Sequence, residues 1–156
     1  MIKRFNIRVY GITIRDDQVL VTDEFRNGLE MTKFPGGGLE QGEGIADCLI
    51  REFKEEFGAE ITVKDIFYIT DFYIASAFNK NEQLISLYYL VDFPLEFQIP
   101  VVNKRFDFLK KEEGSQTFRW IPLASISPED FTFPVDKHVA ALLHQKFIQG
   151  GNENKT

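Results

Sequence analysis

The chain has 156 residues, 44% of them hydrophobic, which suits one well-buried core and is too short for two ordinary domains. Its formal net charge of -6 argues against a broad basic face, so we expect no stable binding to nucleic acid. The single cysteine, Cys48, excludes an intramolecular disulfide and indicates a reducing, cytoplasmic compartment. No stretch has the apolar length of a signal-peptide core or a transmembrane helix, so we expect no membrane association.

The first part of the chain carries β-strand patterns. Residues 6–14 are rich in β-branched and aromatic side chains, and Asp16 and Asp17 follow as a turn before a return strand over residues 18–23. A third strand is predicted over residues 30–34. Pro35 and three successive glycines then predict an abrupt end to that strand and a glycine-rich turn.

After the glycines the hydrophobic period changes from that of a strand to that of a helix. Apolar residues recur at steps of three and four between residues 45 and 57, which predicts an amphipathic helix with one buried stripe: Ile45, Cys48, Leu49, Phe53 and Phe57. Gly58 supplies the stop, because glycine adopts the left-handed conformation that commonly follows a last helical turn.

The remainder predicts two long strands over residues 61–74 and 83–93, a long irregular segment over 94–115, and a strand over 117–121. A second amphipathic helix is predicted over residues 135–148. Residues 150–156 have nothing to bury and are expected to form a flexible tail, which leaves a single domain over residues 1–149.

Three acidic residues of the first helix share one face. Glu52, Glu55 and Glu56 stand at positions i, i+3 and i+4, where their like charges repel unless a cation lies among them. Oxygen-only ligands suit a hard ion such as Mg²⁺ or Mn²⁺. Taken alone, the three residues are more typical of a solvated helix face than of a metal site. The glycines that precede the helix favour a ligand site, because they permit close approach of the backbone.

The combined pattern resembles the signature of the Nudix hydrolase family. Gly37, five residues, Glu43, seven residues and then residues 51–58, Arg-Glu-Phe-Lys-Glu-Glu-Phe-Gly, match the charged and glycine positions of the Nudix box. Ala59 departs from the box, which usually has a larger aliphatic residue there. The resemblance implies the Nudix α/β/α sandwich, with a mixed central sheet between two helices.

The resemblance also implies roles for the box residues. The metal ligands would be Glu52, Glu55 and Glu56, helped by the backbone carbonyl near Gly37. Arg51 and Glu43 resemble the pair that orients the helix carboxylates, a role that metal-binding acidic groups require. Glu52, Glu55 and Arg51 are thus candidate catalytic residues, and which glutamate removes the proton stays open.

Further candidates lie outside the box. An acidic residue in the loop before the last strand is typical of the family, and Glu113 is our candidate for an additional ligand or base, with Glu112 as its rival. Asp136 stands near the position at which the branch that hydrolyses oxidised guanine nucleotides reads the base. The candidate substrate-binding residues are Gly36, Gly37, Gly38, Arg26, Lys33 and Asp136, and solvated surface charge is an equal explanation for Arg26 and Lys33.

The resemblance implies a hydrolase that acts on phosphoanhydride bonds. Mg²⁺-assisted attack of water would cleave the diphosphate of a small nucleoside diphosphate-linked substrate, and a (d)NTP or oxidised purine nucleotide is favoured. Alternatives are ADP-ribose or another sugar nucleotide, a dinucleoside polyphosphate, and a non-catalytic Nudix-fold sensor. A homodimer would be compatible with the family.

Overall fold

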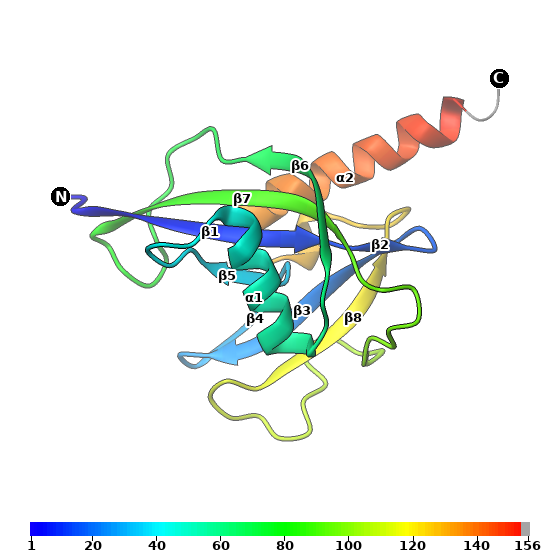
Figure 1. Cartoon of the computed structure of the whole chain (residues 1–156), viewed down its shortest axis with the longest axis horizontal. Coiled ribbons are helices and arrows are strands. Elements are labelled where there is room, and N and C mark those ends of the chain that lie inside the picture. The colour runs from blue at the N-terminus through cyan, green and yellow to red at the C-terminus, as the bar shows by residue number, and fades with distance from the viewer. Residues whose placement is uncertain (154–156) are drawn as a thin grey trace. The chain divides into compact units, whose positions relative to one another are not determined.

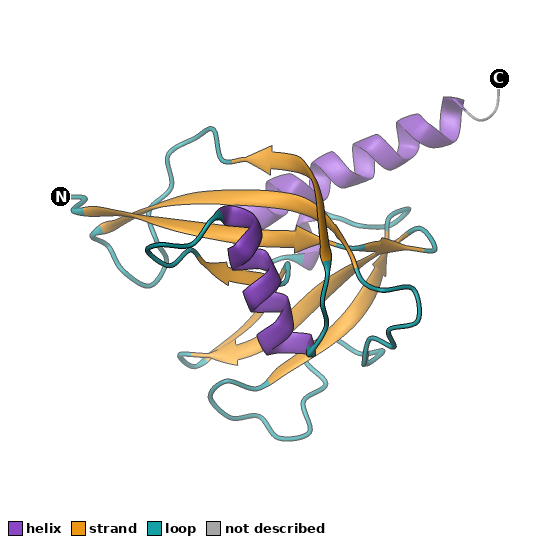
Figure 2. Ribbon diagram, in the orientation of Figure 1, coloured by secondary structure: helices purple, strands orange, loops and turns teal. Residues whose placement is uncertain are grey.

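A computed structural model describes residues 1–153 of the chain (Figure 1). These residues form two compact units. The first unit combines residues 1–13 with residues 35–98, and the second combines residues 14–34 with the chain from residue 99 onward. Each unit has its own four-stranded sheet and its own long helix (Figure 2).

The sheet of the first unit is mixed. Its order is β5-β1-β7-β6, and its strands are β1 (Arg4–Ile12), β5 (Gly36–Gly38), β6 (Thr62–Ile69) and β7 (Glu82–Asp92). The central pair β1–β7 is parallel, whereas β5 and β6 run antiparallel to their neighbours. β6 ends at Ile69, whereas the predicted strand extended to residue 74. Between β6 and β7, Ala75 forms an isolated bridge with Gln83.

The prediction of a glycine-rich turn after Pro35 was wrong. The three glycines form β5, an edge strand in which Gly38 lies opposite Arg8 and Gly36 lies opposite Tyr10. Glycine suits this place because the strands approach closely: a Cβ on Gly36 would collide with the carbonyl oxygen of Val9. Gly36 also has a φ of 146°, which side-chain-bearing residues rarely adopt.

Helix α1 (Ile45–Phe57) packs on one face of this sheet and confirms the prediction for these residues. Cys48, Leu49 and Phe53 form its buried stripe. The Phe53 ring lies so close to β1 that a Cβ on Gly11 would stand 2.5 Å from its Cζ atom. Gly58 ends the helix in the left-handed conformation, with φ of 69°, and its N–H donates to the Lys54 carbonyl.

The sheet of the second unit is antiparallel throughout. Its strands are β2 (Ile14–Arg15), β3 (Gln18–Arg26), β4 (Leu29–Lys33) and β8 (Gln116–Pro122), and β3 pairs with each of the others. The predicted turn at Asp16 and Asp17 is confirmed, since both have positive φ, 49° and 58°, as a two-residue hairpin turn requires. The hairpin joins β2 to β3, whereas β1 belongs to the other sheet.

The second unit ends in a short helix, η1 (Pro128–Asp130), and a long one, α2 (Pro134–Glu153). α2 is longer than predicted, so residues 150–153 are helical where we expected the tail to begin. Residues 154–156 of that predicted tail lie outside the described residues. Within residues 1–153, neither α1 nor α2 is both long and apolar enough to span a bilayer.

The predicted mixed α/β class is confirmed, with two α-helices and a mixed sheet. Instead of one sheet, the strands form two. The segment over residues 94–115 has no helix or strand, as predicted.

Candidate functional site

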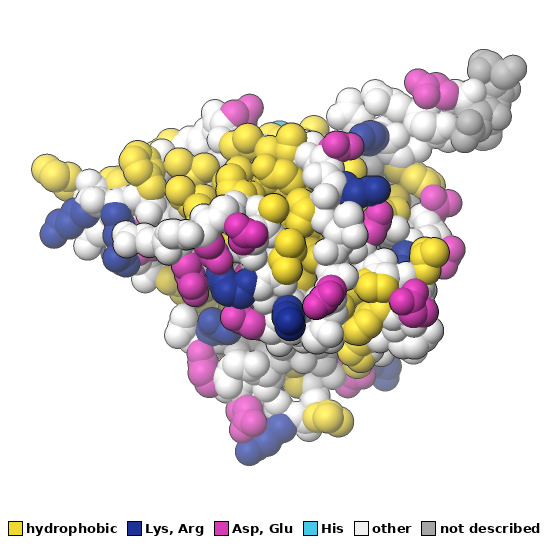
Figure 3. Space-filling model, in the orientation of Figure 1, with side chains coloured by type: hydrophobic (Ala, Val, Ile, Leu, Met, Phe, Trp, Pro, Cys, Tyr) yellow, Lys and Arg dark blue, Asp and Glu magenta, His cyan; other side chains and the backbone are white. Residues whose placement is uncertain are grey.

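The Nudix-box residues are brought together by β5, the loop that follows it and α1, all in the first unit. The helix starts after Gly44, whose N–H donates to Oδ2 of Asp47 over 3.3 Å. This contact satisfies the backbone N–H of the residue that precedes the helix, and the Asp47 carboxylate also suits the positive end of the helix dipole. Acidic and basic side chains gather over α1 in the space-filling view (Figure 3).

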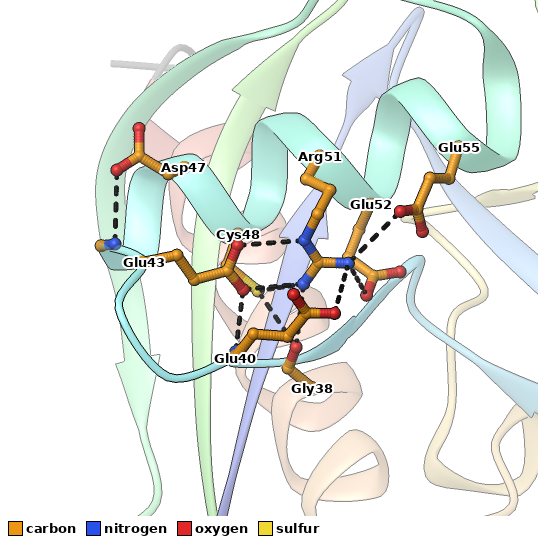
Figure 4. Close-up of polar contacts among 9 residues, drawn as sticks. Gly38, Glu40, Glu43, Asp47, Cys48, Arg51, Glu52 and Glu55 are labelled. Carbon is orange, nitrogen blue, oxygen red and sulfur yellow. Dashed lines mark hydrogen bonds and ion pairs between the residues drawn. The ribbon is translucent and has the colours of Figure 1, made fainter.

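Arg51 is the centre of the polar contacts in this unit (Figure 4). Its Nε and Nη2 atoms donate to the two carboxylate oxygens of Glu43 over 3.0 and 2.7 Å, which is a forked pair. Nη2 also donates to the carbonyl oxygen of Gly38 over 3.1 Å. Arg51 therefore ties the helix to the loop and to the edge strand, as the family resemblance implied for the Arg51–Glu43 pair.

The remaining nitrogen of Arg51, Nη1, faces the helix carboxylates. It lies 2.9 Å from Oε1 of Glu52, 3.6 Å from Oε1 of Glu55 and 3.7 Å from Oε1 of Glu40 (Figure 4). One guanidinium thus offsets the mutual repulsion of carboxylates that stand within a turn of one another. Glu40 was not among the predicted residues, because its role depends on how the loop folds back.

These contacts shift two pKa values in opposite directions. The hydrogen bonds from Arg51, and then the backbone N–H of Glu40, lower the pKa of Glu43 to about 2. The hydrogen bond to Glu43 raises the pKa of Arg51. Both groups therefore stay ionised over the whole physiological pH range.

The depressed pKa of Glu43 predicts how the fold responds to acid. The Arg51–Glu43 contact stabilises the folded state fully above pH 4.5, the ordinary pKa of Glu43, and its contribution is lost as the pH falls toward about 2. Glu43→Gln lacks this charge at every pH. We therefore expect the gap in free energy of unfolding between wild type and Glu43→Gln, measured in urea, to narrow across that range. A gap that stays constant with pH would contradict the assignment.

The Glu52 side chain packs directly on β5. A Cβ on Gly37 would overlap the Glu52 carboxylate, so only glycine leaves room for this side chain. The Glu52 side chain is 16% exposed, whereas that of Glu55 is 61% exposed. The need for glycine at position 37 thus has a steric cause, in addition to any contact between the Gly37 backbone and a ligand.

The donor set suits a hard divalent cation. Glu52 and Glu55 present carboxylate oxygens to the same Arg51 nitrogen, and the backbone of Gly37 lies against one of them. Glu56, on the same helix, has its Oε2 atom shielded from solvent. Within residues 1–153, no three acidic, histidine or cysteine side chains already stand close enough together to hold a metal ion. The assignment of Glu52, Glu55 and Glu56 as ligands stays a prediction.

Cys48 is buried on α1, and its Sγ atom accepts a hydrogen bond from Nη2 of Arg51 over 3.8 Å (Figure 4). Burial raises the pKa of its thiol to about 12, with a further contribution from Glu43. Its Sγ atom lies 3.5 Å from the Gly38 carbonyl oxygen. The side chain therefore acts as a neutral packing group, as its position in the apolar stripe predicted.

The other predicted residues belong to the second unit and have neighbours of their own there. Arg26 is exposed at the end of β3. The Nζ atom of Lys33 lies 3.1 Å from Oε2 of Glu24, and both side chains are largely buried. Asp136 is buried in the first turn of α2. Lys33 is thus a partner of Glu24, which neither the phosphate-binding nor the surface-charge explanation included.

Glu113 caps the turn between β3 and β4. The N–H of Asn27 donates to both of its carboxylate oxygens, over 3.1 and 2.9 Å. The rival candidate, Glu112, pairs with Lys110 over 2.9 Å. The Glu113 contact gives this residue a structural role in the second unit, and its proposed catalytic role stays a prediction.

The comparisons with known proteins show the family and the fold of this chain. The family model of the NUDIX domain matches residues 4–143. The mouse (Mus musculus) protein "Nucleoside diphosphate-linked moiety X motif 6" is 27% identical over 135 residues, which are 86% of this chain and 39% of the mouse protein. The chain therefore spans about two fifths of the length of this curated relative.

Two solved structures have a similar fold. The MutT protein from Methanosarcina mazei Go1 is 19% identical, with a TM-score of 0.63 over 100% of this chain and 99% of that one. A NUDIX hydrolase from Nitrosomonas europaea is 21% identical, with a TM-score of 0.60 over 90% of this chain and 88% of that one. With the NUDIX match extending over residues 4–143, well beyond the box itself, the chain belongs to the Nudix family.

Proposed function

We propose that this chain is a hydrolase that cleaves a phosphoanhydride bond in a small nucleoside diphosphate-linked molecule. The observation that carries the proposal is the approach of the Glu52 and Glu55 carboxylates to one nitrogen of Arg51, beside the Gly37 backbone. The family assignment and the name of the mouse relative support the same class of substrate. A (d)NTP or oxidised purine nucleotide is the substrate that we favour.

The chain itself contributes an arrangement of charge around Arg51. Arg51 holds Glu43 through a forked pair and keeps the Glu52 and Glu55 oxygens near each other despite their like charge. Glu52, Glu55 and Glu56 would hold Mg²⁺, or Mn²⁺ in its place. When bound, such an ion neutralises charge on a diphosphate and polarises its phosphorus toward attack by water. Oxygen donors oriented in advance by Arg51 would reduce the reorganisation that the reaction requires.

A panel of nucleotides tests the proposal. Phosphate release should require Mg²⁺ or Mn²⁺, and Glu55→Gln and Glu56→Gln should each lower kcat/KM by about tenfold to 100-fold. The matched control is Glu60→Gln, because the Glu60 side chain is 83% exposed just beyond the helix and its only described ion pair is with Lys54 at 3.8 Å. Glu60→Gln should retain the wild-type kcat/KM.

The panel also separates the alternatives. Turnover confined to ADP-ribose, to another sugar nucleotide or to dinucleoside polyphosphates would contradict the favoured substrate and leave the class of reaction unchanged. Binding of nucleotides without turnover of any would identify a sensor and contradict the hydrolase. Equal activity in Glu55→Gln, Glu56→Gln and wild type would contradict the assigned metal ligands.

We also propose that the protein works in the cytoplasm. The basis is Cys48, a buried free thiol that a reducing compartment leaves unmodified. This part of the proposal is independent of the substrate.

A further inference from the structure

The two faces of the edge strand β5 (Figure 1) have different neighbours. Gly37 lies between Gly36 and Gly38 in the pairing with β1, so its side-chain direction is opposite to theirs. A Cβ on Gly37 would point at Glu52, on the face that α1 covers. A Cβ on Gly38 would instead point at the guanidinium of Arg8. A strand without side chains therefore separates the helix carboxylates from a second arginine.

Arg8 is held at this strand by contacts within the first unit. Its Nη1 atom would lie 3.2 Å from a Cβ on Gly38. Its Nε atom donates to the hydroxyl oxygen of Tyr10 over 3.3 Å, and its Cζ atom lies 5.9 Å from the Tyr10 ring centroid. With Nε engaged by Tyr10, the orientation of the two terminal nitrogens is restricted along the edge of β5.

The peptide of Gly38 is fixed from the opposite direction. Its carbonyl oxygen accepts a hydrogen bond from Nη2 of Arg51 over 3.1 Å, and Sγ of Cys48 lies 3.5 Å away. Arg8 and Arg51 therefore both lie beside Gly38, and Arg51 also pairs with Glu43 and Glu52. Arg8 is a half-buried residue, and its guanidinium is a second positive group at the strand on which Glu52 packs.

We propose that Arg8 binds a phosphate group of the nucleotide from the face of β5 that carries Gly36 and Gly38. This inference rests on the proposed function and names a residue of its substrate site. The forked guanidinium matches phosphate oxygens, and the lack of a side chain on Gly38 leaves the backbone open to close approach by a ligand. Because β5 is an edge strand, a nucleotide can extend across it, with one phosphate near Arg8 and its diphosphate toward the carboxylates.

Binding of the four deoxynucleoside monophosphates, measured by titration in EDTA, tests this proposal without any contribution from a divalent ion. Arg8→Gln should raise Kd by about tenfold or more for all four, since a lost charge-assisted hydrogen bond has an effect of this size. Arg8→Lys should recover part of the affinity through its charge. Lys64→Gln is the matched control, because Lys64 is an exposed cation of the same unit that pairs with Asp92 over 3.6 Å.

Three results would overturn the proposal. They are no measurable binding of any monophosphate to the wild type, an unchanged Kd in Arg8→Gln, and a loss confined to one base, which would make Arg8 a reader of the base. Should Arg8→Gln not fold, Gly38→Ala provides the same test, because its methyl group crowds Nη1 and should also raise all four Kd values. These measurements involve neither metal nor turnover, so their failure is distinct from failure of the hydrolase assay.

Discussion

Gly37→Ala is expected to lower kcat/KM by more than about 100-fold, because its new methyl group occupies the space of the Glu52 carboxylate. Gly37 has no positive φ, so the backbone itself accepts alanine and the effect arises from the side chain that is displaced. A displacement of about 1 Å at a catalytic group is enough for a loss of this size. Steady-state kinetics with the best nucleotide of the panel would measure it.

Two further variants show whether Glu52 is the cause. Gly37→Ala combined with Glu52→Asp shortens the crowded side chain by one methylene group, so it should unfold at a higher urea concentration than Gly37→Ala alone. Gly150→Ala, in α2, serves as the control, because nothing lies near the position of its Cβ atom. It should retain full activity and gain a little helix stability. Activity of Gly37→Ala within about threefold of wild type would show that Glu52 can move without consequence.

The helix that carries the box was predictable to the residue because its determinants are local. Apolar residues at steps of three and four, followed by Gly58, specify both the buried face and the end of α1. The same spacing places Glu52 and Glu55 on one side with Arg51. The contacts of Arg51 with Glu43 needed the family resemblance as well, since eight residues and a loop separate the two.

Strand β5 was not predictable from its own residues. Three glycines have no alternation of side chains, and their usual place is a turn, so local sequence favours the wrong structure. Pairing with β1 determines the strand, and that pairing joins residues that are about thirty positions apart. The approach of Arg8 to Gly38 depends on this register, which is why Arg8 was not among the predicted site residues.

The charged groups of the second unit were missed for a related reason. Asp23 ends the strand predicted over residues 18–23 and Glu24 follows it, in a polar run that indicates exposure to solvent, yet both are buried in β3. Their charged partners come from two neighbouring strands. Lys33 of β4 pairs with Glu24, and Arg119 of β8, about a hundred residues away in the sequence, pairs with Asp23. Likewise, Lys33 cannot be recognised as a partner of Glu24 until the register of β3 and β4 is known.

Asp23 leads to the second large effect, on stability. This carboxylate has no exposed surface, and it accepts hydrogen bonds from Nε and Nη2 of Arg119 over 2.5 and 3.1 Å. It also accepts from Oγ1 of Thr32 over 2.7 Å and from the backbone N–H of Phe106 over 3.2 Å. The Asp23 side chain thus joins β4, β8 and the segment over residues 94–115 to the central strand of the unit.

Asp23→Ala should lower the free energy of unfolding by about 3–5 kcal/mol, because it leaves the Arg119 guanidinium, only 13% exposed, without its counter-charge. Urea unfolding would measure this loss. Asp92→Ala is the control: Asp92 and Lys64 are both mostly exposed, and such pairs contribute about 1 kcal/mol or less. Replacing Asp23 and Arg119 together with apolar residues should cost less than Asp23→Ala alone, since no charge then stays buried. If the double variant were the less stable of the two, the penalty would not come from the uncompensated arginine. The loss would then belong to the hydrogen bonds from Thr32 and Phe106, which hold β4 and residues 94–115 against β3.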